Sequence, residues 1–105
     1  MVFIETAFFT RYIPEYLSDE EQGALQGHLI EHPDDGDIIP GTGGIRKIRW
    51  GAKGKGKRGG VRIIYYWRTA QSHIYLMSVY GKNEASDLSP KEKVYLRKLV
   101  EVWNQ

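Results

Sequence analysis

The chain contains no cysteine, and this absence excludes several classes of protein. Without thiols it can form no disulfide framework, no zinc or iron–sulfur site held by cysteine, and no thiol nucleophile. It also lacks a run of about 18 apolar residues, so the sequence predicts no membrane-spanning helix. Residues 1–5 lack the basic and apolar regions of a secretory signal. We therefore expect one domain over residues 1–105, in the reducing cytoplasm.

Acidic residues are absent from the middle of the chain. Residues 1–37 carry nine acidic side chains and one basic one, residues 38–83 carry ten basic side chains and no Asp or Glu, and residues 84–105 carry four of each. The formal net charge of +2 therefore divides into −8, +10 and 0. A stretch of 46 residues with basic but no acidic side chains predicts an anionic partner for this part of the domain.

Apolar periodicity and capping residues predict the order of the elements. Strands are expected at residues 2–4, 45–50, 61–68 and 74–80. A first helix begins at Phe8 and is disturbed by Pro14, a second begins at the capping box of Ser18, and a third begins at Ser89. We expect an α+β fold, in which two N-terminal helices and one C-terminal helix pack against one face of a small antiparallel sheet.

The apolar residues of the predicted helices indicate which side of each helix is buried. In the second helix, which Pro33 ends, the expected apolar face is Leu17, Leu25, Leu29 and Ile30. In the C-terminal helix it is Val94, Leu96, Leu99, Val100 and Trp103.

Two short motifs are typical of cofactor or metal sites, but their context argues against both. Residues 54–59 match the dinucleotide-binding fingerprint, yet a predicted strand follows them where that motif needs a helix. His28 and His32 match an inverted zinc-protease motif, yet Pro33 ends the helix at once, and imidazoles in a last turn also oppose the helix dipole. We expect no metal and no cofactor.

Residues 51–60 form a glycine-rich loop with four basic side chains: Lys53, Lys55, Lys57 and Arg58. Alone, such a loop is also typical of a soluble hairpin tip. In the strand that follows, the period of two places Val61, Ile63, Tyr65 and Trp67 on a core face. It places on the opposite face, expected to be open, Arg62, Ile64, Tyr66 and Arg68. Cations and aromatic rings on one surface favour single-stranded RNA as the partner.

Several runs of the sequence are long and specific. They are Asp37-Ile-Ile-Pro-Gly-Thr-Gly-Gly-Ile-Arg-Lys-Ile-Arg-Trp50, Gly54-Lys-Gly-Lys-Arg-Gly-Gly-Val-Arg-Ile-Ile-Tyr-Tyr66, Tyr80-Gly-Lys-Asn-Glu84 and Asp87-Leu-Ser89. With the helix start Tyr16-Leu-Ser-Asp-Glu-Glu21, they resemble the RelE/HigB family of bacterial toxins, most closely its HigB branch. The resemblance implies a RelE-like fold and a ribosome-dependent mRNA endoribonuclease. It also implies three partners: the 70S ribosome, its mRNA, and a HigA-like helix-turn-helix antitoxin through which the complex binds operator DNA.

The resemblance also implies the chemistry, in which a ribose 2′-hydroxyl attacks the adjacent phosphate without a metal. Arg62 aligns with the family arginine that contacts the scissile phosphate, and Lys55 and Lys57 are candidates for base and charge stabilisation. Lys82 is a second candidate phosphate contact, and Tyr80 a candidate acid or stacking residue. Crowded ammonium groups lower one another's pKa, so a lysine can serve as the base. The expected RNA-binding residues are Arg46, Lys47, Arg49, Lys53, Arg58, Tyr66 and Arg68.

Two alternatives use the same basic surface without catalysis. One is an RNA- or ribosome-binding module, because binding and cleaving a phosphate need the same side chains. The other is a protein-interaction module with an extended acidic partner.

Overall fold

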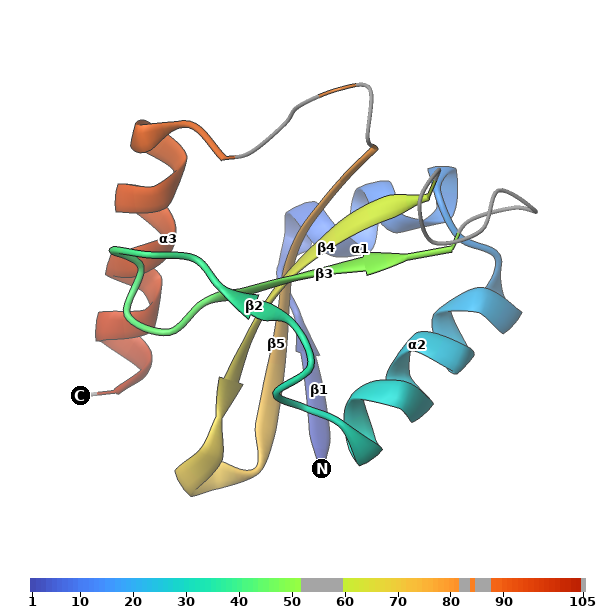
Figure 1. Cartoon of the computed structure of the whole chain (residues 1–105), viewed down its shortest axis with the longest axis horizontal. Helices are drawn as coiled ribbons and strands as arrows, with labels where there is room; N and C mark the ends of the chain where they lie inside the picture. The colour runs from blue at the N-terminus through green and yellow to red at the C-terminus, as the bar shows by residue number, and fades with distance from the viewer. Residues whose placement is uncertain (52–59, 82–83, 85–87, 105) are drawn as a thin grey trace.

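The computed structural model, which describes residues 1–51, 60–81, 84 and 88–104, shows a five-stranded sheet in the order β1-β5-β4-β3-β2 (Figure 1). The strands are β1 (Val2–Glu5), β2 (Asp37–Ile38), β3 (Arg46–Trp50), β4 (Val61–Arg68) and β5 (His73–Gly81). The antiparallel meander of β3, β4 and β5 confirms the sequence prediction. The expectation of a wholly antiparallel sheet is wrong, because β1 pairs in parallel with the first half of β5.

The second and third helices begin at the predicted capping signals, whereas the first begins at Ala7, one residue before the expected Phe8. They are α1 (Ala7–Tyr12), the 3-10 turn η1 (Ile13–Glu15), α2 (Asp19–Glu31), the 3-10 turn η2 (Thr69–Gln71) and α3 (Pro90–Trp103). Pro14 lies in η1, where α1 gives way to the tighter turn. Ser18 and Ser89 each form the predicted capping box, at the start of α2 and of α3. No helix in these described ranges is long and apolar enough to cross a bilayer.

The sheet is covered on both faces, which corrects the expectation of helices on one face. Side chains of α1, η1 and α2 form one core with alternate residues of β4, including Ile63 and Tyr65. The helix α3 lies on the other face (Figure 1), where its side chains form a second core with Ile64 and Met77. Ile63 and Ile64 are adjacent in sequence, and both are completely buried. Successive strand residues point to opposite faces, so burial of both requires a layer on each side.

Two residues expected in helical core faces are exposed. Ile30 in α2 is 53% exposed and Val94 in α3 is 54% exposed. In each helix the residues one turn apart, such as Leu25 and Leu29, already fill the contact with the sheet, and the next position points away from it.

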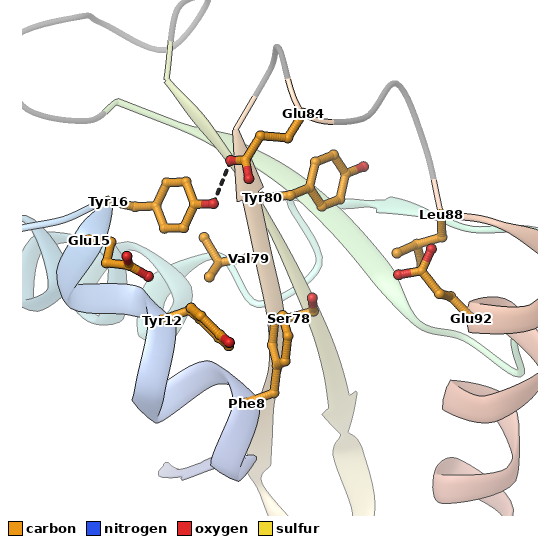
Figure 2. Close-up of a pocket in the computed structure, with 10 residues that line it drawn as sticks. All are labelled: Phe8, Tyr12, Glu15, Tyr16, Ser78, Val79, Tyr80, Glu84, Leu88 and Glu92. Atoms are coloured by element: carbon orange, nitrogen blue, oxygen red, sulfur yellow. Dashed lines mark hydrogen bonds between the residues drawn. The ribbon is translucent and has the colours of Figure 1, made fainter.

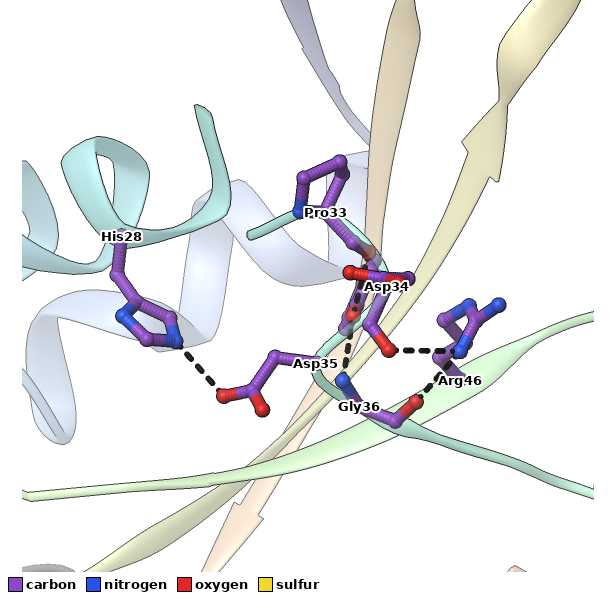
Figure 3. A network of polar contacts seen from close by, with 7 residues as sticks. His28, Pro33, Asp34, Asp35, Gly36 and Arg46 are labelled. Atoms are coloured by element: carbon purple, nitrogen blue, oxygen red, sulfur yellow. Dashed lines mark hydrogen bonds and ion pairs between the residues drawn. The ribbon is translucent and has the colours of Figure 1, made fainter. Parts of the chain in front are cut away.

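A polar network anchors the segment between α2 and β2 to the sheet (Figure 3). The buried hydroxyl of Tyr65 accepts from the Gly36 amide at 2.9 Å and donates to the Pro33 carbonyl at 2.8 Å. Nη1 of Arg46 donates to the carbonyls of Asp34 and Gly36, at 2.9 and 2.8 Å. Because these partners are mostly backbone groups, they fix the path of the chain from α2 into β2.

Candidate active site

One row of residues crosses the three central strands at the end of the sheet where β5 ends. In the strand register Arg49 of β3 lies opposite Arg62 of β4, which lies opposite Tyr80 of β5. Directly opposed residues of neighbouring strands project from the same face with Cβ atoms about 5 Å apart. We call Arg49, Arg62 and Tyr80 the Arg62 row.

Arg62 has a buried donor without an acceptor in the described part of the chain, and it lies opposite a second cation, Arg49. Nη1 of Arg62 is buried and makes no hydrogen bond within the described part of the chain. Arg49 is exposed and directly opposite, and like charges in that position destabilise a sheet. A buried cationic donor without an acceptor also costs free energy. An anion placed between the two guanidinium groups would remove both costs.

Gly60 brings β3 and β4 together beside this row. A Cβ atom on Gly60 would lie 1.9 Å from the carbonyl oxygen of Trp50, so no other residue fits without a backbone shift. Gly51 and Gly60 are the described ends of the segment that carries most of the predicted catalytic lysines. The predicted residues that lie outside the described part of the chain are Lys53, Lys55, Lys57, Arg58 and Lys82.

A groove of about 540 Å³ runs along the outer side of β5 next to Tyr80 (Figure 2). Phe8, Tyr12 and Tyr16 form one wall, and Leu88 and Glu92 form the other (Figure 2). The groove exists because β1 pairs with residues 73–76 of β5, so within the described ranges the last part of β5 has no strand neighbour on that side.

Within this groove Tyr16 donates a short hydrogen bond to the carboxylate of Glu84 (Figure 2). Burial, followed by the hydrogen bond and charge of Glu84, raises the pKa of Tyr16 to about 12. The hydrogen bond from Tyr16, followed by one from the Gly81 amide, lowers the pKa of Glu84. Tyr16 is therefore a neutral donor and Glu84 an ionised acceptor at neutral pH. Sequence reasoning missed this pair, because 68 residues separate the partners and no local pattern marks them.

A comparison with protein-family models assigns the chain to a family. A family model described as "RelE toxin of RelE / RelB toxin-antitoxin system" matches residues 4–105. The chain belongs to the RelE toxin family. RelE toxins pair with an antitoxin, generally act on ribosomes and are generally endoribonucleases. The HigB-like branch within this resemblance stays a prediction.

In this RelE toxin most of the β4 face that carries Arg62 is covered. This corrects the expectation that the whole face is open. Ile64 is completely buried beneath α3, and the Tyr66 hydroxyl accepts from the Asn104 side chain at 2.8 Å. The neighbouring Tyr75 ring stacks on Trp103 with centroids 3.9 Å apart. Ile64 and Tyr66, which follow Arg62 on this face, therefore pack against the C-terminal helix.

The remaining predicted residues of the toxin are spread over both faces. Arg46 lies on the α2 side in the network of Figure 3, away from the Arg62 row. Lys47 lies next along β3 on the face of Arg62 and opposite Asp37 of β2. Arg68 lies at the far end of β4, opposite His73. The structure thus brings together Arg49, Arg62 and Tyr80, and separates Arg46 and Arg68 from them.

Tyr80 belongs to both the Arg62 row and the groove. Its ring is 8% exposed and packs in the core on the α3 side together with Leu88. Tyr80 therefore lines the candidate site with a mostly buried side chain.

Proposed function

We propose that this RelE toxin is a ribosome-dependent mRNA endoribonuclease that cleaves without a metal, through attack of a ribose 2′-hydroxyl on the adjacent phosphate. The observation that carries the proposal is Arg62, whose buried Nη1 has no acceptor in the described part of the chain. In the strand register Arg62 lies opposite a second arginine, Arg49. A phosphate accepts two parallel hydrogen bonds from a planar guanidinium. An RNA phosphate held there also lies beside the ends of both segments that carry the predicted lysines.

The reaction divides into three tasks for the protein. The 2′-oxygen loses its proton to a base and bonds to phosphorus, the bond from phosphorus to the 5′-oxygen breaks, and an acid gives that oxygen a proton. The products are a 2′,3′-cyclic phosphate and a 5′-hydroxyl. In this scheme Arg62 stabilises the charge that develops on the phosphate oxygens. Lys55 and Lys57 serve as base and as further charge stabilisers, Lys82 as a second phosphate contact, and Tyr80 as acid or stacking residue.

The proposal extends to the partners of the toxin. Arg49, Lys47, Lys53 and Arg58 bind neighbouring phosphates of mRNA or ribosomal RNA in the 70S ribosome. A HigA-like helix-turn-helix antitoxin neutralises the toxin in the cytoplasm, and the complex binds operator DNA through the antitoxin.

The test maps the ends of mRNA after incubation with the purified toxin, with and without ribosomes. We expect 5′-hydroxyl ends that require ribosomes and persist in a chelator of divalent metals, at concentrations that leave the ribosome intact. Arg62→Ala should lower the cleavage rate by about 100-fold or more, as loss of one transition-state donor does. Arg68→Ala, on the same strand and face about 20 Å away, should leave it within about twofold.

Two results would count against the proposal. Ribosome binding without new mRNA ends would favour the non-catalytic RNA- or ribosome-binding module. Cleavage of naked RNA that depends on added metal would contradict the mechanism.

A further inference from the structure

Glu84 contacts Gly81, the last residue of β5, through both its side chain and its backbone. One carboxylate oxygen of Glu84 accepts from the Gly81 amide at 2.8 Å. The Glu84 amide in turn donates to the Gly81 carbonyl at 3.1 Å. The two residues are therefore held together by side chain and backbone at once.

Tyr16 ties this turn to a distant part of the chain. The same carboxylate oxygen of Glu84 accepts the hydrogen bond from the Tyr16 hydroxyl (Figure 2). Tyr16 follows η1, where its amide donates to the Ile13 carbonyl at 2.9 Å, and the next residue, Leu17, is buried in the core. The backbone that carries the Tyr16 side chain is therefore held in place on both sides. A hydrogen bond to a charged acceptor is stronger than one between neutral groups.

The turn begins directly beside the Arg62 row. Gly81 follows Tyr80 and pairs with Val61, the neighbour of Arg62 in β4. A Cβ atom on Gly81 would lie 2.8 Å from the Glu84 carboxylate, so any other residue here would push that carboxylate away. In the chain Lys82 stands between Gly81 and Glu84, and both residues that bracket it belong to the contact.

We propose that Glu84 and Tyr16 are positioning residues, which hold the end of β5, with Tyr80 and Gly81, in place for cleavage of the phosphodiester bound at Arg62. The inference rests on the proposed function, since it assigns these residues a task in that reaction. We call the contact of Tyr16, Gly81 and Glu84 the β5 latch. Neither side chain of the latch touches the phosphate in this account.

The kinetic test compares variants that break the β5 latch with variants that keep it. Glu84→Ala removes the acceptor and should lower kcat on ribosome-bound mRNA by about tenfold or more, with KM changed by less than about twofold, because misplaced groups slow chemistry more than binding. Glu84→Gln keeps an acceptor oxygen and should stay within about threefold of wild type. Tyr16→Phe should lower kcat by about three- to tenfold, about the effect of one lost hydrogen bond.

A matched control is Tyr12→Phe. Tyr12 lines the same groove as Tyr16, and its hydroxyl makes no hydrogen bond within the described ranges. The control should cleave like wild type. The double variant Tyr16→Phe/Glu84→Ala should be no slower than Glu84→Ala alone, because both changes remove the same contact.

Amide hydrogen exchange tests the β5 latch without any cleavage. Exchange of the Gly81 amide should speed up by about tenfold in Glu84→Ala and less in Glu84→Gln, while core amides of β4 stay protected. A wild-type chain that cuts no mRNA contradicts the proposed function, and the exchange rate of Gly81 still decides whether the latch exists.

Two results would overturn the inference. The first is wild-type kcat in Glu84→Ala. The second is equal loss in Glu84→Gln and Glu84→Ala, since that would assign the effect to the charge of Glu84 and not to the position of the turn.

Discussion

Arg46 and Arg62 lie on neighbouring strands of one sheet, yet their surroundings differ completely. Nη1 of Arg46 donates to two backbone carbonyls and so helps to fix the chain between α2 and β2. Nη1 of Arg62 is buried with no such acceptor in the described ranges and faces Arg49. The difference teaches that a basic composition does not identify a working surface. In our proposal the arginine whose Nη1 has no acceptor in the described ranges, Arg62, is the one that binds the phosphate.

The same contrast holds for two parts of the sheet. Around Arg46 and Tyr65, the polar groups of the network in Figure 3 have partners, and Trp103 stacks on Tyr75 on the other face. At the end with the Arg62 row, a glycine allows close strand contact and cations are left opposite one another. Polar groups are therefore paired around Arg46 and Tyr65, whereas we propose that a phosphate completes the contacts of the Arg62 row.

The largest expected effect on stability comes from Tyr65→Phe. The variant leaves the Gly36 amide and the Pro33 carbonyl without their partner, so the free energy of unfolding should fall by about 1 to 3 kcal/mol. Urea unfolding followed by circular dichroism measures it. Tyr12→Phe serves as the control, and an equal loss in both variants would contradict the role of the network.

Arg46→Ala should lower the free energy of unfolding by about 1 to 2 kcal/mol, because two backbone carbonyls lose their donor. Arg49→Ala, three residues further along β3, should leave stability unchanged or slightly higher, since it removes like-charge repulsion. Chemical denaturation of both variants sharpens the comparison. If Arg49→Ala were the less stable of the two, the division between the two parts of the sheet would be wrong.

Tyr65 also predicts a response to alkaline pH. Burial is the main cause that raises its pKa above the usual value of 10.0, so ionisation is harder in the folded state than in the unfolded state. Its contribution to stability is therefore complete below about pH 10 and is lost as the pH rises through the folded pKa. Stability curves above pH 9 should be flatter for Tyr65→Phe than for wild type. Parallel curves for the two proteins would contradict this prediction.

The smallest expected effect is on the salt dependence of binding. Arg49→Ala should weaken ribosome binding and reduce the slope of log affinity against log salt by about one, as loss of one phosphate contact does. Arg97→Ala is the control, because Arg97 lies on α3 and pairs with Glu101 at 3.2 Å. Binding titrations at several salt concentrations measure the slope. An equal change in both variants would show that Arg49 makes no specific phosphate contact in the interface.

Local signals in the sequence predicted much of the fold. The bounds of β4 and the starts of α2 and α3 were predictable, because alternation and capping boxes depend on residues close together in the chain. The parallel pairing of β1 with β5 and the placement of α3 on the second face were not. Both depend on contacts between segments far apart in sequence, on which local periodicity carries no information.

The candidate site was predictable to a similar degree. The strand period and the family resemblance selected Arg62, and the register then added Arg49 and Tyr80 beside it. The sequence could not separate Arg46 from these residues, because its carbonyl acceptors are set by tertiary structure. The β5 latch could not be predicted from the sequence either, because it joins Tyr16 to Glu84, 68 residues later in the chain.

The most direct test of the central claim measures stability and cleavage in the same preparation of Arg62→Ala. If the fold leaves Arg62 available for a phosphate, mRNA cleavage on ribosomes should fall by about 100-fold or more, while the free energy of unfolding equals or exceeds that of wild type. A variant that loses about 2 kcal/mol of stability, or that still cleaves at the wild-type rate, would contradict the account.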